Sequence, residues 1–162
     1  ITADNARLVS NLHANLGGLY RMNGHPDLAR EHMEKSISLL DQFNLLHIND
    51  SIPQIANYAM FLTEQQEPER GISELQKLSG IIKEYHSDDC LDYAKVQETL
   101  GTIYLMTANL PQAKTHFKRA FKIYEKIWAD EPEMIEAKYQ EIQELYPQIG
   151  FCIGKTLSGL LT

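Results

Sequence analysis

Cysteine and basic residues are scarce in this 162-residue chain. Its two cysteines, Cys90 and Cys152, lie far apart and no Cys-x-x-Cys or Cys/His cluster accompanies them. This pattern argues against a disulfide framework and against a cysteine-based zinc site. Fifteen Lys and Arg stand against 22 Asp and Glu, a formal charge of −7. Because binding to phosphates needs concentrated basic residues, we expect no direct contact with nucleic acid.

Long apolar runs are missing as well. The most apolar stretch, residues 149–161, contains Lys155 and is shorter than the ~20 residues that span a bilayer. The chain does not open with a signal peptide pattern. We therefore expect a cytoplasmic protein without membrane contact. Because the chain begins with Ile1 rather than Met, we interpret it as part of a longer protein.

Signals of catalysis and of metal binding are absent too. The six histidines show no recognised metal-ligand spacing with one another, with cysteine or with acidic residues, so we interpret them as structural or solvated. No Ser or Cys nucleophile has a base in its sequence context, and the many glutamates fall on solvent faces of the expected helices. We predict a protein that is not an enzyme and has no catalytic residue, metal or cofactor.

What the chain does contain is a repeat of 42 residues. Small residues recur at this period in two columns that lie 12 positions apart: Gly17, Ala59 and Gly101, then Ala29, Gly71 and Ala113. Antiparallel helices can cross at such positions so closely that neither backbone tolerates a large side chain. Large residues share the period as Leu16, Tyr58 and Leu100, as Met33, Leu75 and Phe117, as Leu40, Ile82 and Tyr124, and as Phe43, Tyr85 and Ile127.

Turn residues separate these apolar stripes. Gly24 can end a helix in the left-handed conformation, and a proline follows at the expected start of each second helix. Oxygen-bearing side chains at 49–51 and 87–89 are expected to cap the helices that follow them. The pattern predicts no strand, and it predicts helices over residues 3–23, 26–44, 52–65, 68–86, 89–108, 111–129, 132–146 and 148–161.

Residues 15–20 (Asn-Leu-Gly-Gly-Leu-Tyr) and 99–104 (Thr-Leu-Gly-Thr-Ile-Tyr), with the small and apolar columns that follow them, resemble the tetratricopeptide repeat. The usual repeat has ~34 residues. The longer period is similar to repeats of the kinesin light chain type and of bacterial peptide-sensing regulators. The resemblance implies an all-α fold, a right-handed α-α superhelix of about four helical hairpins. We expect a single domain over 1–162, with repeats at about 10–51, 52–93 and 94–135 and a divergent terminal pair at 136–162.

The resemblance also implies a module that binds a protein or peptide partner in a concave groove. In the kinesin light chain type, an asparagine before the Leu-small pair hydrogen-bonds the backbone of an extended peptide. Asn15 and Asn57 occupy that column, whereas Thr99 and Glu141 depart from it. The two further columns that clamp chaperone tails lack the required Lys and Asn. The remaining groove candidates on the first helices are Arg21, Met22, Met60, Thr63, Thr99, Thr102 and Met106.

Several alternatives stay open at this point. Asn15 and Asn57 could instead cap a helix or join two helices, since a buried amide needs a partner. The methionines could fill gaps between stacked units. The segment could be the peptide-sensing part of a larger signalling or transcription-regulating protein. It could also form a homodimer through a small-residue strip at Gly150 and Gly154 with Leu157.

Overall fold

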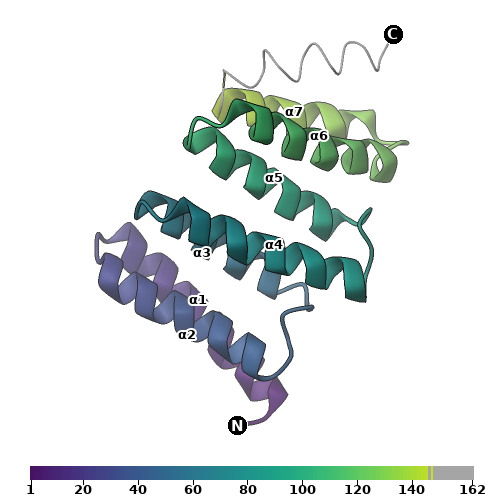
Figure 1. The fold of residues 1–162 in the computed structure, drawn as a ribbon. Coiled ribbons are helices and arrows are strands. Elements are labelled where there is room, and N and C mark those ends of the chain that lie inside the picture. Colours follow the sequence, from purple (N-terminus) through teal and green to yellow (C-terminus); the bar gives the residue numbers. More distant parts are fainter. Residues whose placement is uncertain (146, 148–162) are drawn as a thin grey trace. The chain divides into compact units, whose positions relative to one another are not determined.

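The computed structural model describes residues 1–145 and 147, and this part of the chain is helical (Figure 1). It contains no strand, and its seven α-helices are α1 (Ala3–Met22), α2 (Pro26–Gln42), α3 (Ser51–Glu64), α4 (Pro68–Tyr85), α5 (Leu91–Met106), α6 (Leu110–Ile127) and α7 (Pro132–Leu145). The seven predicted helices up to residue 146 are confirmed, with ends that agree to within two residues. The eighth, 148–161, lies outside the described residues.

The chain divides into two compact units, Ile1–Ser87 and Asp88–Thr162. In the first unit α1 packs against α2, α3 packs against α4, and α3 also contacts both helices of the first hairpin. In the second unit α5 pairs with α6, and α7 packs on α6. The all-helical hairpin architecture is therefore confirmed for the described part of the chain, while the grouping of all residues into one domain stays a prediction.

The helices of the first two hairpins cross at the small residues, as the 42-residue period predicts. A Cβ added at Gly17 would lie 2.6 Å from Cγ of Met33 and 3.3 Å from the carbonyl oxygen of Ala29. A Cβ added at Gly71 would lie 2.6 Å from the carbonyl oxygen of Ala59. Real Cβ atoms do not approach other atoms this closely, so the glycines permit the crossing.

The turns inside the hairpins repeat one backbone conformation. Gly24 has a φ of 75°, and the residues 42 and 84 positions later, Gln66 and Ala108, have φ values of 65° and 59°. Each lies in the left-handed region that commonly ends a helix. Two of these positions therefore carry a side chain where glycine is the easiest residue to accommodate.

The predicted oxygen caps before α3 and α5 are wrong. Asp50 precedes α3 but makes no side-chain cap bond, because its carboxylate bonds Arg7 and Asn11 of α1. Cys90 is the residue that caps α5, and its Sγ accepts a hydrogen bond of 3.4 Å from the backbone N–H of Tyr93.

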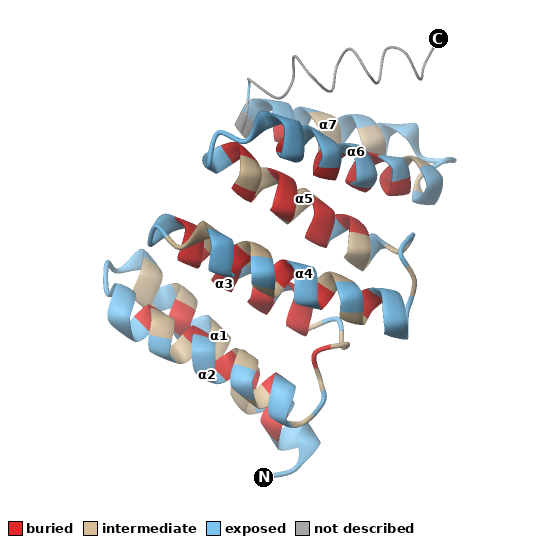
Figure 2. Cartoon of the chain, in the orientation of Figure 1, coloured by how far each residue is buried: buried red, intermediate tan, exposed pale blue. Residues whose placement is uncertain are grey.

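Most of the predicted apolar columns are buried between the helices (Figure 2). The column that ends in Phe117 and the column that ends in Tyr124 are buried in all three hairpins. The column of Phe43, Tyr85 and Ile127 is only partly covered, because its members lie at the last residue or cap of a second helix. Leu16 is exposed, whereas its repeat equivalents Tyr58 and Leu100 are buried.

The divergent fourth unit is described through α7. Ile142 of α7 is buried in a cluster with Phe121 and Tyr124 of α6. The proposed dimer strip of Gly150, Gly154 and Leu157 lies outside the described residues. None of the helices in the described part combines the length and apolar character that a bilayer crossing requires.

Candidate functional site

A hollow of about 360 Å³ lies between the first three helices, within the first unit. Residues of α1, of α2, of α3 and of the loop before α3 line it. The lining residues are Asn11, Ala14, Asn15, Met33, Ser36, Asp50, Pro53, Gln54 and Asn57. The volume falls in the range of ligand-binding clefts, and the lining combines amides with a few apolar groups.

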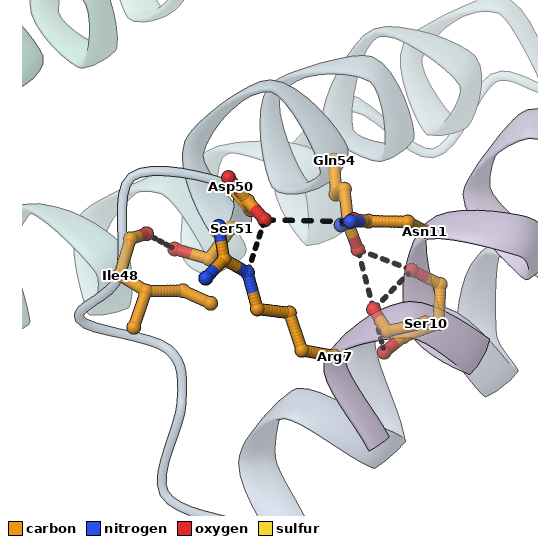
Figure 3. A network of polar contacts seen from close by, with 8 residues as sticks. Arg7, Ser10, Asn11, Ile48, Asp50, Ser51 and Gln54 are labelled. Atoms are coloured by element: carbon orange, nitrogen blue, oxygen red, sulfur yellow. Dashed lines mark hydrogen bonds and ion pairs between the residues drawn. The ribbon is translucent and has the colours of Figure 1, made fainter. Parts of the chain in front are cut away.

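Gln54 is the centre of a polar network beside this hollow (Figure 3). Its Oε1 accepts from the hydroxyl of Ser10 at 2.8 Å and from the hydroxyl of Ser36. Its Nε2 donates to Oδ1 of Asn11 at 2.5 Å. Gln54 and both serines are buried. The network thus satisfies buried polar groups from all three helices and holds them in one arrangement.

Asp50 extends this network at the loop before α3. Nε of Arg7 donates to its Oδ2 at 2.6 Å and Nδ2 of Asn11 donates to the same oxygen at 3.3 Å. The bond from Arg7, and then that from Asn11, lower the pKa of the Asp50 carboxyl, which is therefore ionised at neutral pH. The hydroxyl of Ser51 lies 2.7 Å from the carbonyl oxygen of Ile48 and fixes the loop that carries Asp50 (Figure 3).

Asn15 and Asn57 differ from their neighbours in the lining. Both side chains are exposed, and neither makes a hydrogen bond to any other described residue. The two carboxamides line the same hollow from α1 and α3, at equivalent positions of the repeat. Each can donate two hydrogen bonds and accept others. No described contact supports the alternative that these asparagines cap a helix or join two helices.

The other predicted groove residues of the first unit do not line this hollow. Arg21 forms an ion pair with Glu64, with its Nε donating to Oε2 at 2.8 Å. Thr63 is buried, and its hydroxyl donates to the carbonyl oxygen of Ala59 at 2.9 Å. Met22 is exposed at the end of α1, and Met60 is half-buried. Their part in binding stays a prediction.

In the second unit the predicted hydroxyls are used within their own helix. Thr99 donates to the carbonyl oxygen of Lys95 at 2.9 Å, and Thr102 donates to that of Glu98 at 3.1 Å. Met106 is exposed at the end of α5. The equivalents of Asn15 and Asn57 therefore do not offer the same free amide in this unit.

Sequence reasoning missed several residues of the site. Asn11 lies one helical turn before Asn15, and Gln54 lies three residues before Asn57, so helical spacing could have identified both. Asp50 was expected to cap α3, and Ser36 gave no signal beyond being a small polar residue in an apolar stripe.

The structure also pairs two histidines that the sequence analysis treated separately. Nδ1 of His13 lies 2.7 Å from Nδ1 of His32, and the ring of Tyr20 stacks on His32 with centroids 5.3 Å apart. One of these nitrogens must donate and the other accept. Burial, and then the charge of His32, lower the pKa of His13. Within residues 1–145 and 147, no three His, Cys, Asp or Glu residues gather as a metal site.

Comparisons with known proteins agree with the architecture. Residues 51–126 match the family model of the tetratricopeptide repeat, so the predicted resemblance is confirmed there. The crystal structure of BtubC (BKLC) from P. vanneervenii has a TM-score of 0.72 to this chain at 18% sequence identity. The match covers 90% of this chain and 58% of that protein, so this chain spans less than two thirds of its length. No curated protein sequence matches the chain.

Proposed function

We propose that this chain, whose residues 51–126 are tetratricopeptide repeats, binds an extended peptide segment of another protein in the hollow between α1, α2 and α3. Such repeats are generally scaffolds for protein–protein interaction. One observation carries the proposal: Asn15 and Asn57 line one hollow and have no hydrogen-bond partner among the described residues. An extended peptide has unpaired main-chain N–H and C=O groups, which a carboxamide can satisfy together.

The surroundings of the two asparagines support this proposal. The network around Gln54 holds the walls of the hollow before any ligand arrives, which lowers the ordering cost of binding. Ala14, Met33 and Pro53 add apolar surface on which a ligand side chain can pack. Where an extended peptide is bound through its main chain, hydrogen bonds to that main chain supply affinity and contacts to its side chains supply specificity.

The proposal can be tested with a library of random 12-residue peptides displayed on phage. A selected peptide is labelled with fluorescein, and its dissociation constant is measured by fluorescence anisotropy. The double variant Asn15→Ala, Asn57→Ala should bind about 5- to 100-fold more weakly, the loss of two hydrogen bonds of ordinary strength. Its melting temperature should change by less than about 2 °C, because both side chains lack internal partners.

A matched control removes two exposed amides elsewhere. Gln42 ends α2 and Gln76 lies on α4, and neither lines the hollow. Gln42→Ala with Gln76→Ala should leave the dissociation constant unchanged. Unchanged affinity of the double asparagine variant would contradict the proposal. A loss of many degrees in its melting temperature would make the asparagines structural instead.

A further inference from the structure

The charge in the lining of the hollow comes from Asp50. It is the one ionised side chain among the described residues that line the hollow, and none of these residues is a lysine, arginine or histidine. The bonds from Arg7 and Asn11 lower the pKa of the Asp50 carboxyl, which keeps its negative charge at neutral pH. The lining therefore offers a ligand a negative charge beside the neutral amides.

The described bonds to this carboxylate all end on one of its two oxygens (Figure 3). Nε of Arg7 and Nδ2 of Asn11 both donate to Oδ2. No described residue donates to Oδ1, and 29% of the Asp50 side chain is accessible with both donors in place. Arg7 thus uses one nitrogen on one oxygen, whereas a guanidinium that occupies a whole carboxylate donates to both oxygens. Oδ1 is left to accept a further charged hydrogen bond.

Neighbouring side chains fix the position of the carboxylate. Asn11, which donates to it, also accepts from Nε2 of Gln54 at 2.5 Å. The hydroxyl of Ser51 lies 2.7 Å from the carbonyl oxygen of Ile48 and holds the loop before α3. A charge that is held in advance pairs with a ligand at a smaller ordering cost.

We infer that the peptide bound in the hollow carries a lysine or arginine whose side chain pairs with Oδ1 of Asp50. This inference rests on the proposed function, which places an extended peptide in the hollow. The formal charge of −7 favours the same ligand, since attraction between opposite charges speeds the encounter. An acidic side chain at this place would be repelled by Asp50 and would meet no cation in the described lining.

The helix geometry also predicts where the basic residue lies along the peptide. Asp50 precedes Asn57 by seven residues, about 10.5 Å of helical rise. Its carboxylate bonds Asn11, which precedes Asn15 by four residues, about 6 Å. An extended chain advances about 3.3 Å per residue. We therefore expect the basic residue two or three positions from the residue whose main chain bonds the two asparagines.

The peptides that the phage library selects on the full chain provide the test, and they should share a lysine or arginine at one position. A selected peptide with lysine there is compared with the same peptide carrying norleucine, which keeps the aliphatic chain but lacks the charge. The ratio of the two dissociation constants, norleucine over lysine, measures recognition of the charge. For the wild-type chain we expect a ratio of about 3–30, between that of an exposed ion pair and that of a charged hydrogen bond.

Two variants should change this ratio in opposite directions. Asp50→Asn keeps the shape of the side chain and an oxygen that can accept from Arg7, but it removes the charge, so the ratio should fall to about 1. Arg7→Gln removes the guanidinium that shares the carboxylate and keeps a good helix former in α1, so the ratio should rise about 2- to 5-fold. The matched control is Asp27→Asn, which removes an equal charge at an exposed position outside the lining and should leave the ratio unchanged.

The outcomes separate this inference from the proposed function. Asn15→Ala with Asn57→Ala should weaken both peptides alike and leave the ratio unchanged. If that double variant weakens binding but the selected peptides share no basic residue, or the ratio persists in Asp50→Asn, the inference alone is overturned. A double variant that binds as tightly as the wild type, or a library without a binding peptide, overturns the proposed function and this inference with it. The norleucine comparison leaves the protein unaltered, so it keeps the test valid if Asp50→Asn lowers the melting temperature, and a wild-type ratio of about 1 would overturn the inference.

Discussion

The backbone of Gly71 in α4 touches the backbone of Ala59 in α3. A Cβ at Gly71 would lie 2.6 Å from the carbonyl oxygen of Ala59 and 3.2 Å from its Cα. At Gly17 and Gly101, by contrast, the nearest atom to an added Cβ belongs to a side chain, Met33 or Phe117. Of these three contacts, only the one between α3 and α4 cannot make room for a larger residue by rotating a side chain.

This contact predicts a large difference between two glycines of one helix. Gly71→Ala should lower the free energy of unfolding by about 1–3 kcal/mol, since the hairpin must shift to admit a methyl group. Gly80→Ala, also in α4, should raise it by about 0.5–1 kcal/mol, because an added Cβ there meets no atom within 4 Å. Urea unfolding followed by circular dichroism measures both. Equal effects of the two substitutions would contradict the close crossing.

Acid should destabilise the second unit through His116. This imidazole is buried, and its Nδ1–H donates to Oε1 of Gln97 at 2.8 Å. Burial, with a smaller effect of Arg119, lowers the pKa of His116 to about 4, against about 6.5 in an unfolded chain. The unfolded state thus binds the proton more tightly between these values. Stability is complete above about pH 6.5 and is lost as the pH falls toward 4, by about 2 kcal/mol between pH 7 and pH 5.

Trp128 provides the measurement, since it is the one tryptophan of the chain and stacks on Tyr124 in the second unit. Urea unfolding followed by its fluorescence at pH 7, 6 and 5 should show the loss. His116→Gln cannot titrate, so the variant should lose most of this pH dependence. A slope that is the same in the variant and the wild type would exclude His116 as its source.

The polar network beside the hollow should depend on Gln54. Gln54→Leu leaves the hydroxyls of Ser10 and Ser36 and the amide of Asn11 without their shared partner, and two of these groups are buried. We expect a loss of about 2–4 kcal/mol in the free energy of unfolding. Gln76→Leu, on the exposed side of α4, should change it by less than about 0.5 kcal/mol. Thermal unfolding of both variants tests this prediction. If Gln54→Leu were as stable as the wild type, the network would add no stability.

The left-handed turn positions predict a stabilising substitution. Ala108 has a φ of 59°, a conformation that costs an L-residue about 1–2 kcal/mol. Ala108→Gly should therefore stabilise the protein by about 1 kcal/mol, and Gly24→Ala, at the equivalent position of the first hairpin, should destabilise it by a similar amount. Chemical denaturation compares the pair. Stability changes of opposite sign in the two variants would support a left-handed conformation at both positions. A destabilising Ala108→Gly would contradict it.

Much of the fold is readable from the sequence because one period governs it. The period of 42 residues locates the helices and pairs Gly17 with Ala29 and Ala59 with Gly71, and the structure confirms both crossings. The same period could have assigned the left-handed conformation of Gln66 and Ala108 from that of Gly24, although neither residue type favours it. The exposure of Leu16 could not be predicted from the repeat. The burial of a residue on the first helix depends on its neighbours in space, and the repeat period does not specify these.

The candidate site was only partly readable for a related reason. Asn15 and Asn57 stand in a repeat column, so their common location followed from the period. The bonds of Gln54 and Asp50 instead join residues about 43 positions apart, one more than the period. Predicting them requires the side-by-side offset of α1 and α3, which depends on packing. Cys90 caps α5 because the backbone path places it at the start of that helix. The usual preference for Asp or Ser at a cap position would have selected one of its neighbours instead.

Two ion pairs join α1 to α3 and to the residue just before it, near opposite ends of α1. Arg7 bonds Asp50 at the start, and Arg21 bonds Glu64 14 residues further along α1, about 21 Å by helical rise. Each pair is solvent-accessible and adds little stability alone. Sliding α1 by one turn, about 5.4 Å, would break both together. The side chains that α1 and α3 present to each other therefore keep a fixed register. This register also fixes the distance between the amides of Asn15 and Asn57, and a peptide bound as we propose would have to match that distance with the spacing of its own main-chain groups.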